Sequence, residues 1–290
     1  MFEGVLTALV TPFRDGQVDE PALRNLVERQ IEAGVDGLVP CGSTGEAATL
    51  SHAEHRRVVE IVVDAARGRV PVVAGTGSNS TREAIDLTRH AKEAGADGAL
   101  LISPYYNKPT QQGLYEHYAA IARETEFPLV VYNIPGRTAS NILPETMARL
   151  AEIEQVVGVK EASGDLEQVS KVVNLCPEDF AVLSGDDALT LPILAVGGRG
   201  VISTSSNLAP AEMAELVRAF RAGEPDRARD VHRRLLPLFE VLFCETNPIP
   251  VKAAVAMLGA IGEELRLPLT PLSAPHRERL RGVLKELGLL

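Results

Sequence analysis

Short apolar runs alternate with longer helical segments along most of the sequence, and this alternation constrains the fold more than any other feature. The runs are rich in Val, Ile and Leu, as is typical of strands buried on both faces. The predicted strands are residues 5–10, 37–40, 70–74, 98–102, 129–133, 156–160, 181–184 and 200–203. The predicted helices are residues 21–33, 53–66, 82–94, 111–124, 144–151, 166–175, 189–196 and 211–222. Because strands separated by helices pair in parallel, these units predict an α/β fold, a closed (β/α)8 TIM barrel.

Two glycines support a repeated βα unit. Gly34 and Gly95 stand where helices should end, in the similar phrases Glu-Ala-Gly-Val-Asp-Gly and Glu-Ala-Gly-Ala-Asp-Gly. A doubly wound sheet would also alternate strands with helices, but no Gly-x-Gly-x-x-Gly motif follows the first predicted strand. The barrel is therefore the favoured interpretation.

The strand pattern stops after Gly223, and three helical segments follow, at residues 226–243, 250–258 and 274–287. We expect residues 1–223 to form the catalytic barrel and residues 224–290 to form a C-terminal helical extension. The Asn-Pro-Ile-Pro sequence at 247–250 is the predicted joint, and the extension is expected to be an appendage.

Composition excludes several classes of function. The chain has 290 residues and a net charge of −10 with both signs interspersed, which argues against nucleic acid or an anionic membrane as the main partner. The first residues lack a basic region followed by an apolar one, and no run of eighteen apolar residues occurs, so we expect a cytoplasmic protein. The three cysteines, far apart in sequence, fit reduced thiols better than disulfides or a zinc site.

Lys160 is the residue that most directly predicts chemistry. It ends a predicted buried strand, and burial would lower the pKa of its ammonium toward neutrality. A lysine that is partly uncharged can attack a carbonyl carbon and form a Schiff base. The alternative is a strand-end lysine whose charged head simply extends into solvent.

Polar motifs follow other predicted strands, at the end of a barrel where active sites lie. Residues 42–46 (Gly-Ser-Thr-Gly-Glu) could bind a carboxylate through backbone N–H groups and hydroxyls, or could be an ordinary helix-capping turn. Tyr105 and Tyr106 follow the fourth strand, while Tyr132 and Arg137 belong to the fifth strand and its loop. A tyrosine can pass a proton, and an arginine can bind a carboxylate through two hydrogen bonds. The alternatives are that the tyrosines only fill the core and that Arg137 only forms a salt bridge within its loop.

Other signals are weaker. The loop at 197–200 (Gly-Gly-Arg-Gly) resembles a phosphate-binding loop, but it precedes the eighth strand and so belongs to the opposite end of the barrel. The loop after the seventh strand lies at the correct end, but its paired acids at 186–187 would repel a phosphate. Cys41 is expected to be a buried apolar thiol, since no histidine adjoins it in sequence. His52 and His55 lie three residues apart, but without a further ligand at matching spacing a surface role is favoured over a metal site.

Four motifs in order resemble those of the dihydrodipicolinate synthase family, which belongs with the pyruvate-dependent class I aldolases and N-acetylneuraminate lyases. They are residues 42–46, 105–109, 132–138 and 159–165. The resemblance implies that Lys160 forms an imine with pyruvate and that the resulting enamine adds to the aldehyde of L-aspartate 4-semialdehyde. The product would be 4-hydroxy-tetrahydrodipicolinate, in lysine and diaminopimelate biosynthesis. No metal or cofactor other than the covalent imine is implied.

The same resemblance assigns roles to individual residues. Lys160, Tyr132, Thr44 and Tyr106 would be catalytic, with the last three forming a proton relay. Tyr106 would come from a neighbouring subunit of a homotetramer built from tight dimers. The residues implied in substrate binding are Ser43, Thr44, Arg137, Gly185 and Ile202. Arg137 would receive the semialdehyde carboxylate, and Ser43 stands where many relatives have a threonine.

An allosteric site for L-lysine at the tight-dimer interface is also implied. Its residues would be Ala48, His52, His55, Asn79, Glu83 and Tyr105. In this hypothesis the carboxylate of Glu83 pairs with a lysine ammonium, and lysine is a feedback inhibitor.

Two alternatives remain open. A sister aldolase, such as N-acetylneuraminate lyase or a 2-keto-3-deoxy sugar acid aldolase, would share Lys160 and the tyrosine, but Arg137 favours a substrate that carries a carboxylate. A non-catalytic barrel that only binds a carboxylate metabolite is the second alternative.

Overall fold

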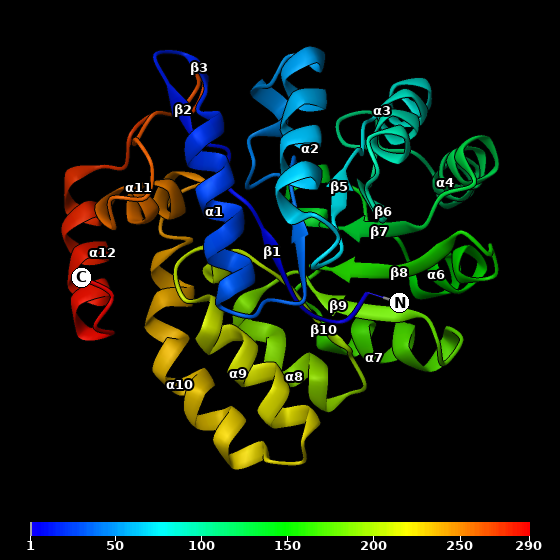
Figure 1. The fold of residues 1–290 in the computed structure, drawn as a ribbon. Helices are drawn as coiled ribbons and strands as arrows, with labels where there is room; N and C mark the ends of the chain where they lie inside the picture. Colours follow the sequence, from blue (N-terminus) through cyan, green and yellow to red (C-terminus); the bar gives the residue numbers. More distant parts are fainter. Residues whose placement is uncertain (1) are drawn as a thin grey trace.

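The computed structural model describes residues 2–290 and forms a barrel of parallel strands surrounded by helices (Figure 1). Within these residues the eight-stranded sheet has the order β4-β1-β10-β9-β8-β7-β6-β5. An isolated parallel bridge between Leu38 and Val72 joins the two edges and closes the ring. The barrel strands are β1 (Gly4–Ala8), β4 (Gly37–Val39), β5 (Val73–Gly75), β6 (Gly98–Ile102), β7 (Leu129–Asn133), β8 (Val156–Glu161), β9 (Ala181–Ser184) and β10 (Gly200–Ser203). The predicted (β/α)8 barrel is confirmed.

The strands carry two separate apolar surfaces, because successive side chains point to opposite faces. One set fills the interior of the barrel and includes Leu6, Val39, Val130 and Ile202. The other set packs against the surrounding helices in a much larger core. This division explains why the strands read as continuous apolar runs in the sequence.

Helices cover the outside of the barrel, and several begin at a side-chain cap. The side chains of Ser51, Ser80, Thr110 and Asp165 each accept a hydrogen bond from a backbone N–H of the first helical turn. The helices of the barrel are α1 (Glu20–Glu32), α2 (His52–Ala66), α3 (Thr81–Glu93), α4 (Gln111–Thr125), α6 (Pro144–Ala151), α7 (Leu166–Leu175), α8 (Thr190–Ala195) and α9 (Pro210–Arg221). Every predicted helix is present within one or two residues.

Several short elements were absent from the prediction, among them a hairpin and a one-turn helix. A hairpin of β2 (Phe13–Arg14) and β3 (Gln17–Val18) precedes α1, and the one-turn helix α5 (Pro135–Thr138) follows β7. Both are too short to produce a recognisable periodicity. Since α5 carries Arg137, it matters for the site described below.

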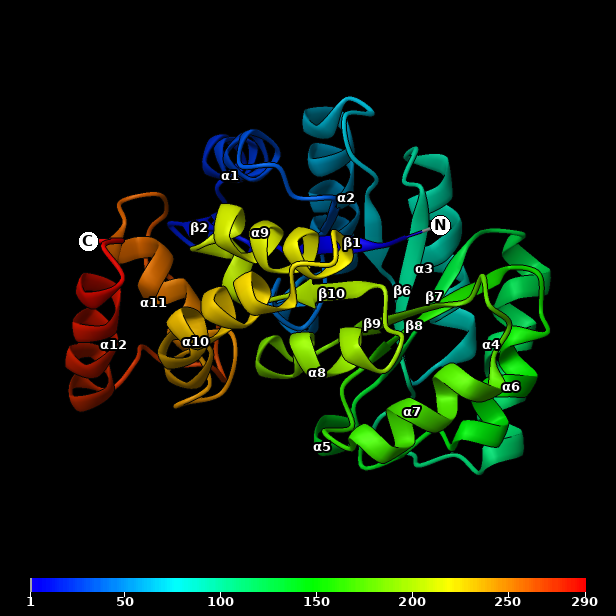
Figure 2. The ribbon, with the colours of Figure 1, turned by 90° about the horizontal axis from the view of Figure 1, so that it is seen from below.

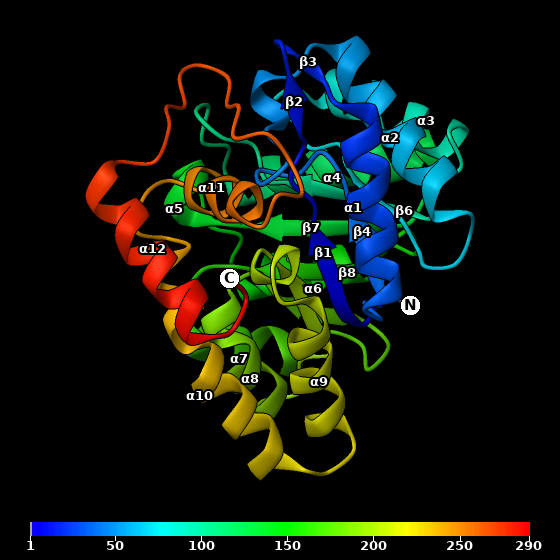
Figure 3. The same cartoon turned by 60° about the vertical axis from the view of Figure 1, so that its left-hand side comes forward.

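The C-terminal helices α10 (Pro225–Val241), α11 (Ile249–Met257) and α12 (Ala274–Glu286) lie together, beside α9 and away from α4 and α6 (Figure 2). These helices do more than flank the barrel. Lys252 of α11 is fully buried and pairs with Glu46 of the barrel, and residues 246–248, just before α11, line the cavity at the barrel mouth. Figure 3 shows α11 between α12 and the strands of the barrel. The division of the chain at residue 223 stays a prediction.

Within residues 2–290, none of the helices combines the length and the apolar character that crossing a membrane requires.

Candidate active site

Lys160 lies near the carboxyl end of β8 and is 6% exposed. Its Nζ is 4.3 Å from the centroid of the Tyr132 ring, because Lys160 and Tyr132 are paired across the neighbouring strands β8 and β7. Burial lowers the pKa of Lys160 to about 8; the Asp187 carboxyl opposes this shift, and the Arg137 guanidinium adds to it. An amine with this pKa is partly uncharged near neutral pH and is available as a nucleophile.

The residue after Lys160 holds this strand end in place from the other face of the sheet. Glu161 is 1% exposed and accepts hydrogen bonds from the Ser163 backbone N–H at 2.8 Å and from Asn133 Nδ2 at 3.2 Å. Burial raises the pKa of its carboxyl, and these hydrogen bonds partly offset the rise. The network joins the ends of β7 and β8, which carry Tyr132 and Lys160. No role for Glu161 was predicted from the sequence, although an acidic residue ending an apolar strand is a visible signal.

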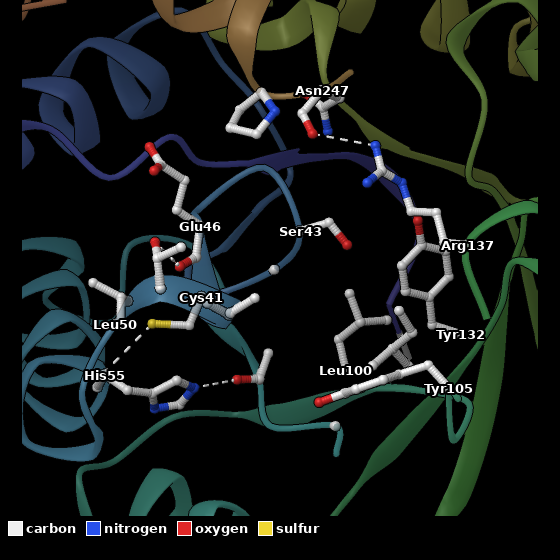
Figure 4. Close-up of a pocket in the computed structure, with 18 of the residues that line it drawn as sticks. Cys41, Ser43, Glu46, Leu50, His55, Leu100, Tyr105, Tyr132, Arg137 and Asn247 are labelled. Atoms are coloured by element: carbon white, nitrogen blue, oxygen red, sulfur yellow. Dashed lines mark hydrogen bonds between the residues drawn. The ribbon is translucent and has the colours of Figure 1, made fainter. Parts of the chain in front are cut away.

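The phenol of Tyr132 lies between Lys160 and the mouth of the barrel. Its side chain is 5% exposed, and burial raises its pKa to about 12, while the Arg137 guanidinium and the Ser43 hydroxyl oppose the rise. Figure 4 shows Ser43 beside this phenol and Arg137 above it. A phenol of this kind stays protonated at neutral pH and can donate a hydrogen bond.

Thr44 follows Ser43 in the turn after β4 and is 3% exposed. Its Oγ1 accepts a hydrogen bond from Asn247 Nδ2 at 2.9 Å. Two residues further on, Glu46 has a positive φ of 53° and forms a fully buried ion pair with Lys252, with Oε1 and Nζ 2.6 Å apart. The sequence did not indicate this pair or the contact of Asn247, since the partners are about two hundred residues apart.

Arg137 is exposed at the entrance, on α5. Its Nη2 donates to the backbone oxygen of Asn247 at 3.2 Å, which leaves other N–H groups of the guanidinium for a ligand (Figure 4). The planar guanidinium suits a carboxylate bound through two hydrogen bonds.

A cavity of 470 Å³ opens at this end of the barrel. Ser43, Tyr132 and Arg137 line it, whereas Lys160 lies deeper. Gly185 lies against the Lys160 stem, since a β-carbon there would come within 3.1 Å of the Cε atom of the lysine. Ile202 belongs to the apolar interior of the barrel. The floor of the site is therefore largely apolar, and Ser43, Tyr132 and Arg137 supply polar groups above it.

Tyr106 stands apart from the other predicted catalytic residues. It is 89% exposed and has a positive φ of 71°, and it is not among the residues that line the cavity. The neighbouring Tyr105 is 38% exposed and does line the cavity. Within one chain, Tyr106 does not meet Thr44 and Tyr132.

The residues predicted to bind lysine lie at the other side of the same cavity. Ala48, His52, His55, Glu83 and Tyr105 all line it. Glu83 accepts from His52 Nε2 at 2.8 Å, and also from Ser78. Asn79 does not line the cavity, but its Nδ2 donates to the Tyr105 backbone oxygen at 3.2 Å.

The surface role expected for His55 is wrong. This side chain is 6% exposed, and its Nε2 lies 2.7 Å from the Gly75 backbone oxygen. Burial lowers the pKa of the imidazole, with a smaller opposing effect from that hydrogen bond. His52 is exposed, as expected.

Cys41 is buried, as predicted, and burial raises the pKa of its thiol, which makes it a poor nucleophile. Asp187 is also buried, and its Oδ2 accepts from the backbone N–H groups of Thr204 and Ser205. Across the part of the chain that the structure describes, no three His, Cys, Asp or Glu side chains are grouped as metal ligands.

Comparison with known proteins places this geometry in a family. Residues 1–287 match the model of the dihydrodipicolinate synthetase family. A 4-hydroxy-tetrahydrodipicolinate synthase of Syntrophus aciditrophicus is 60% identical over 290 residues, and the match covers all of both chains.

Comparison with solved structures leads to the same family. Dihydrodipicolinate synthase from Thermotoga maritima superposes with a TM-score of 0.99 at 48% identity and full coverage of both chains. The enzyme from Cyanidioschyzon merolae, solved with lysine bound, has a TM-score of 0.97 at 44% identity, covering 100% of this chain and 99% of that one. The chain therefore belongs to the dihydrodipicolinate synthetase family.

Proposed function

We infer that this chain condenses pyruvate with L-aspartate 4-semialdehyde to give 4-hydroxy-tetrahydrodipicolinate, a step of lysine and diaminopimelate biosynthesis. The observation that carries this function is the buried Lys160 amine, with its pKa lowered to about 8, beneath a cavity that has an arginine at its entrance. The full-length similarity to enzymes of this name supports the choice of substrates.

Lys160 acts as the nucleophile. Its free amine adds to the keto carbon of pyruvate, and loss of water from the adduct gives an iminium ion. The iminium withdraws electrons from the methyl group, so a methyl proton leaves and an enamine forms. The enamine carbon then attacks the aldehyde of the second substrate. Lys160 supplies this chemistry through the covalent imine, without a further cofactor.

Thr44, Tyr132 and Tyr106 form the proton relay for these steps. Support comes from the buried hydroxyl of Thr44 and from the Tyr132 phenol, which stays protonated because burial raises its pKa to about 12. The exposure of Tyr106 fits a residue that enters the site of a second subunit, so a dimer is the smallest active unit and a homotetramer of such dimers is the assembly.

The carboxylates of pyruvate and of the semialdehyde bind at different depths in the site. Ser43, Thr44, Gly185 and Ile202 surround pyruvate, next to the lysine stem. Arg137 binds the carboxylate of the semialdehyde at the entrance, where its guanidinium is exposed. The loss of a methyl group at Ser43, compared with threonine, loosens the packing but keeps the hydroxyl.

L-lysine is a feedback inhibitor that binds near Ala48, His52, His55, Asn79, Glu83 and Tyr105. The carboxylate of Glu83 would pair with an ammonium of the ligand, and five of the six residues line one cavity. The lysine-bound Cyanidioschyzon merolae structure supports this assignment. The enzyme acts in the cytoplasm, where these metabolites are made.

A substrate panel tests the function. Pyruvate is supplied with aspartate semialdehyde or with N-acetylmannosamine, and product formation is followed for each pair. We expect turnover only of the pair that contains the semialdehyde, because Arg137 binds a carboxylate. Turnover only of the pair that contains the neutral sugar would support a sister aldolase. No turnover of either pair would support a carboxylate-binding barrel.

A further inference from the structure

The segment between α10 and α11 lies at the mouth of the barrel. Thr246, Asn247 and Pro248 line the cavity together with Tyr132 and Arg137. Asn247 is 6% exposed, so it is buried at the same level as the catalytic side chains rather than on the outer surface.

Asn247 connects two residues that come from different loops. Its side-chain Nδ2 donates to Thr44 Oγ1 at 2.9 Å. Its backbone oxygen accepts from Arg137 Nη2 at 3.2 Å, a contact that Figure 4 shows. Thr44 follows β4 and Arg137 follows β7, which are separated in the ring. A single residue of the C-terminal extension therefore contacts both a proposed relay residue and the proposed carboxylate-binding residue.

The direction of the bond to Thr44 has a chemical consequence. An amide nitrogen can only donate, so the Thr44 oxygen accepts and its single proton must point elsewhere. Among residues 2–290, no partner lies within hydrogen-bond distance of the Asn247 Oδ1 atom, so the bond from Nδ2 to Thr44 is the one hydrogen bond that this side chain makes. The proton of Thr44 remains available to a phenol of the relay.

Neighbouring contacts hold both partners in place independently of this amide. Lys252 lies on α11, five residues after Asn247, and pairs with Glu46, two residues after Thr44. The Arg266 backbone N–H donates to the second oxygen of Glu46 at 3.2 Å. The turn that carries Thr44 and the segment that carries Asn247 are thus joined by a buried ion pair, and a change at the Asn247 side chain leaves this pair intact.

We propose that Asn247 is a positioning residue that directs the Thr44 hydroxyl proton into the relay and fixes Arg137 through its backbone oxygen. The proposal rests on the proposed function, because it assumes that Thr44 transfers protons during the condensation. It assigns a catalytic purpose to the C-terminal extension, which closes the site rather than merely flanking the barrel.

Two substitutions separate hydrogen-bond direction from packing. Asn247→Asp keeps the shape, but its carboxylate can only accept, so the Thr44 proton turns toward it and leaves the relay. Asn247→Ala removes the bond. Both variants are expected to lower kcat by about 10- to 100-fold, a part of the usual contribution of acid–base catalysis, while the KM for pyruvate changes less than about threefold. Asn174→Ala, on the exposed face of α7, is the matched control and should leave kcat unchanged.

A double-mutant cycle tests whether Asn247 acts through Thr44. The kcat of Thr44→Val/Asn247→Ala should equal that of Thr44→Val within about twofold, because Thr44→Val has already removed the hydroxyl through which Asn247 acts. Multiplied losses in the double variant would overturn the proposal, as would a wild-type kcat for Asn247→Asp.

Borohydride trapping of pyruvate is run on every variant. Wild-type enzyme that traps no pyruvate would refute the proposed function. Wild-type enzyme that traps pyruvate, together with Asn247 variants of full kcat, would refute only the role of Asn247. Variants that trap pyruvate normally but turn over slowly are the expected result, and normal trapping also shows that they are folded.

Discussion

The buried pair of Glu46 and Lys252 should be the ion pair whose loss destabilises the protein most. Both side chains are fully buried and their charged atoms are 2.6 Å apart. Burial lowers the pKa of Lys252, and the charge of Glu46 opposes that shift. The Lys252 ammonium also lies 4.2 Å from the centroid of the Phe13 ring. Lys252→Met removes one charge and leaves the carboxylate of Glu46 buried without its partner.

Removing one member of a buried ion pair lowers the free energy of unfolding by about 3–5 kcal/mol. At about 2–4 °C per kcal/mol for a chain of this size class, Lys252→Met should lower the melting temperature by about 6–20 °C. Lys171→Met is the matched control, because Lys171 pairs with Glu167 across an exposed helix surface. Solvent screens that pair, so the control should change the melting temperature by no more than about 2 °C.

Scanning calorimetry of these two variants, of Glu46→Gln and of Glu46→Gln/Lys252→Met checks this reasoning. The double variant should be more stable than the sum of its single changes implies, since it removes both buried charges. Equal melting temperatures for Lys252→Met and Lys171→Met would refute the argument, and so would simple additivity in the double variant.

Three further predictions concern catalysis and control. Because burial lowers the pKa of Lys160 to about 8, about 10% of its amine is free at pH 7 and about 90% at pH 9, so kcat/KM for pyruvate should rise about tenfold between these values; a flat profile would contradict this. Arg137→Ala should raise the KM for the semialdehyde about 10- to 100-fold, through the loss of a charge-assisted hydrogen bond, and spare the KM for pyruvate; equal effects on both substrates would contradict its role. Millimolar L-lysine should inhibit the wild type and inhibit Glu83→Gln less, and unchanged wild-type activity would remove the regulatory proposal.

The sequence predicted the barrel well because its signals are local. Each strand is a short apolar run, and each helix has its own periodicity or cap, as in the run that ends at Lys160 and the helix that begins after Asp165. The positions of Lys160, Tyr132 and Ser43 at one end of the barrel also followed from local order, since parallel strands end on the same side.

The missed features depend on contacts between distant parts of the chain. Nothing near Asn247 or Lys252 in the sequence indicates that these residues meet Thr44 and Glu46, so the C-terminal helices looked like an appendage. His55 was expected at the surface because the sequence offers no further metal ligand at matching spacing, but its helix face turns toward Gly75. Tertiary packing decided these positions, and no local pattern records it.

The central claim is that the amine of Lys160 forms the imine with pyruvate. The most direct measurement is peptide mass spectrometry after reduction of the enzyme with borohydride in the presence of pyruvate, with pyruvate omitted in a control. The account predicts one reduced pyruvate adduct, on the peptide that contains Lys160, and none in the control or in Lys160→Ala. An adduct on any other lysine, or an unmodified chain under conditions of full turnover, would contradict it.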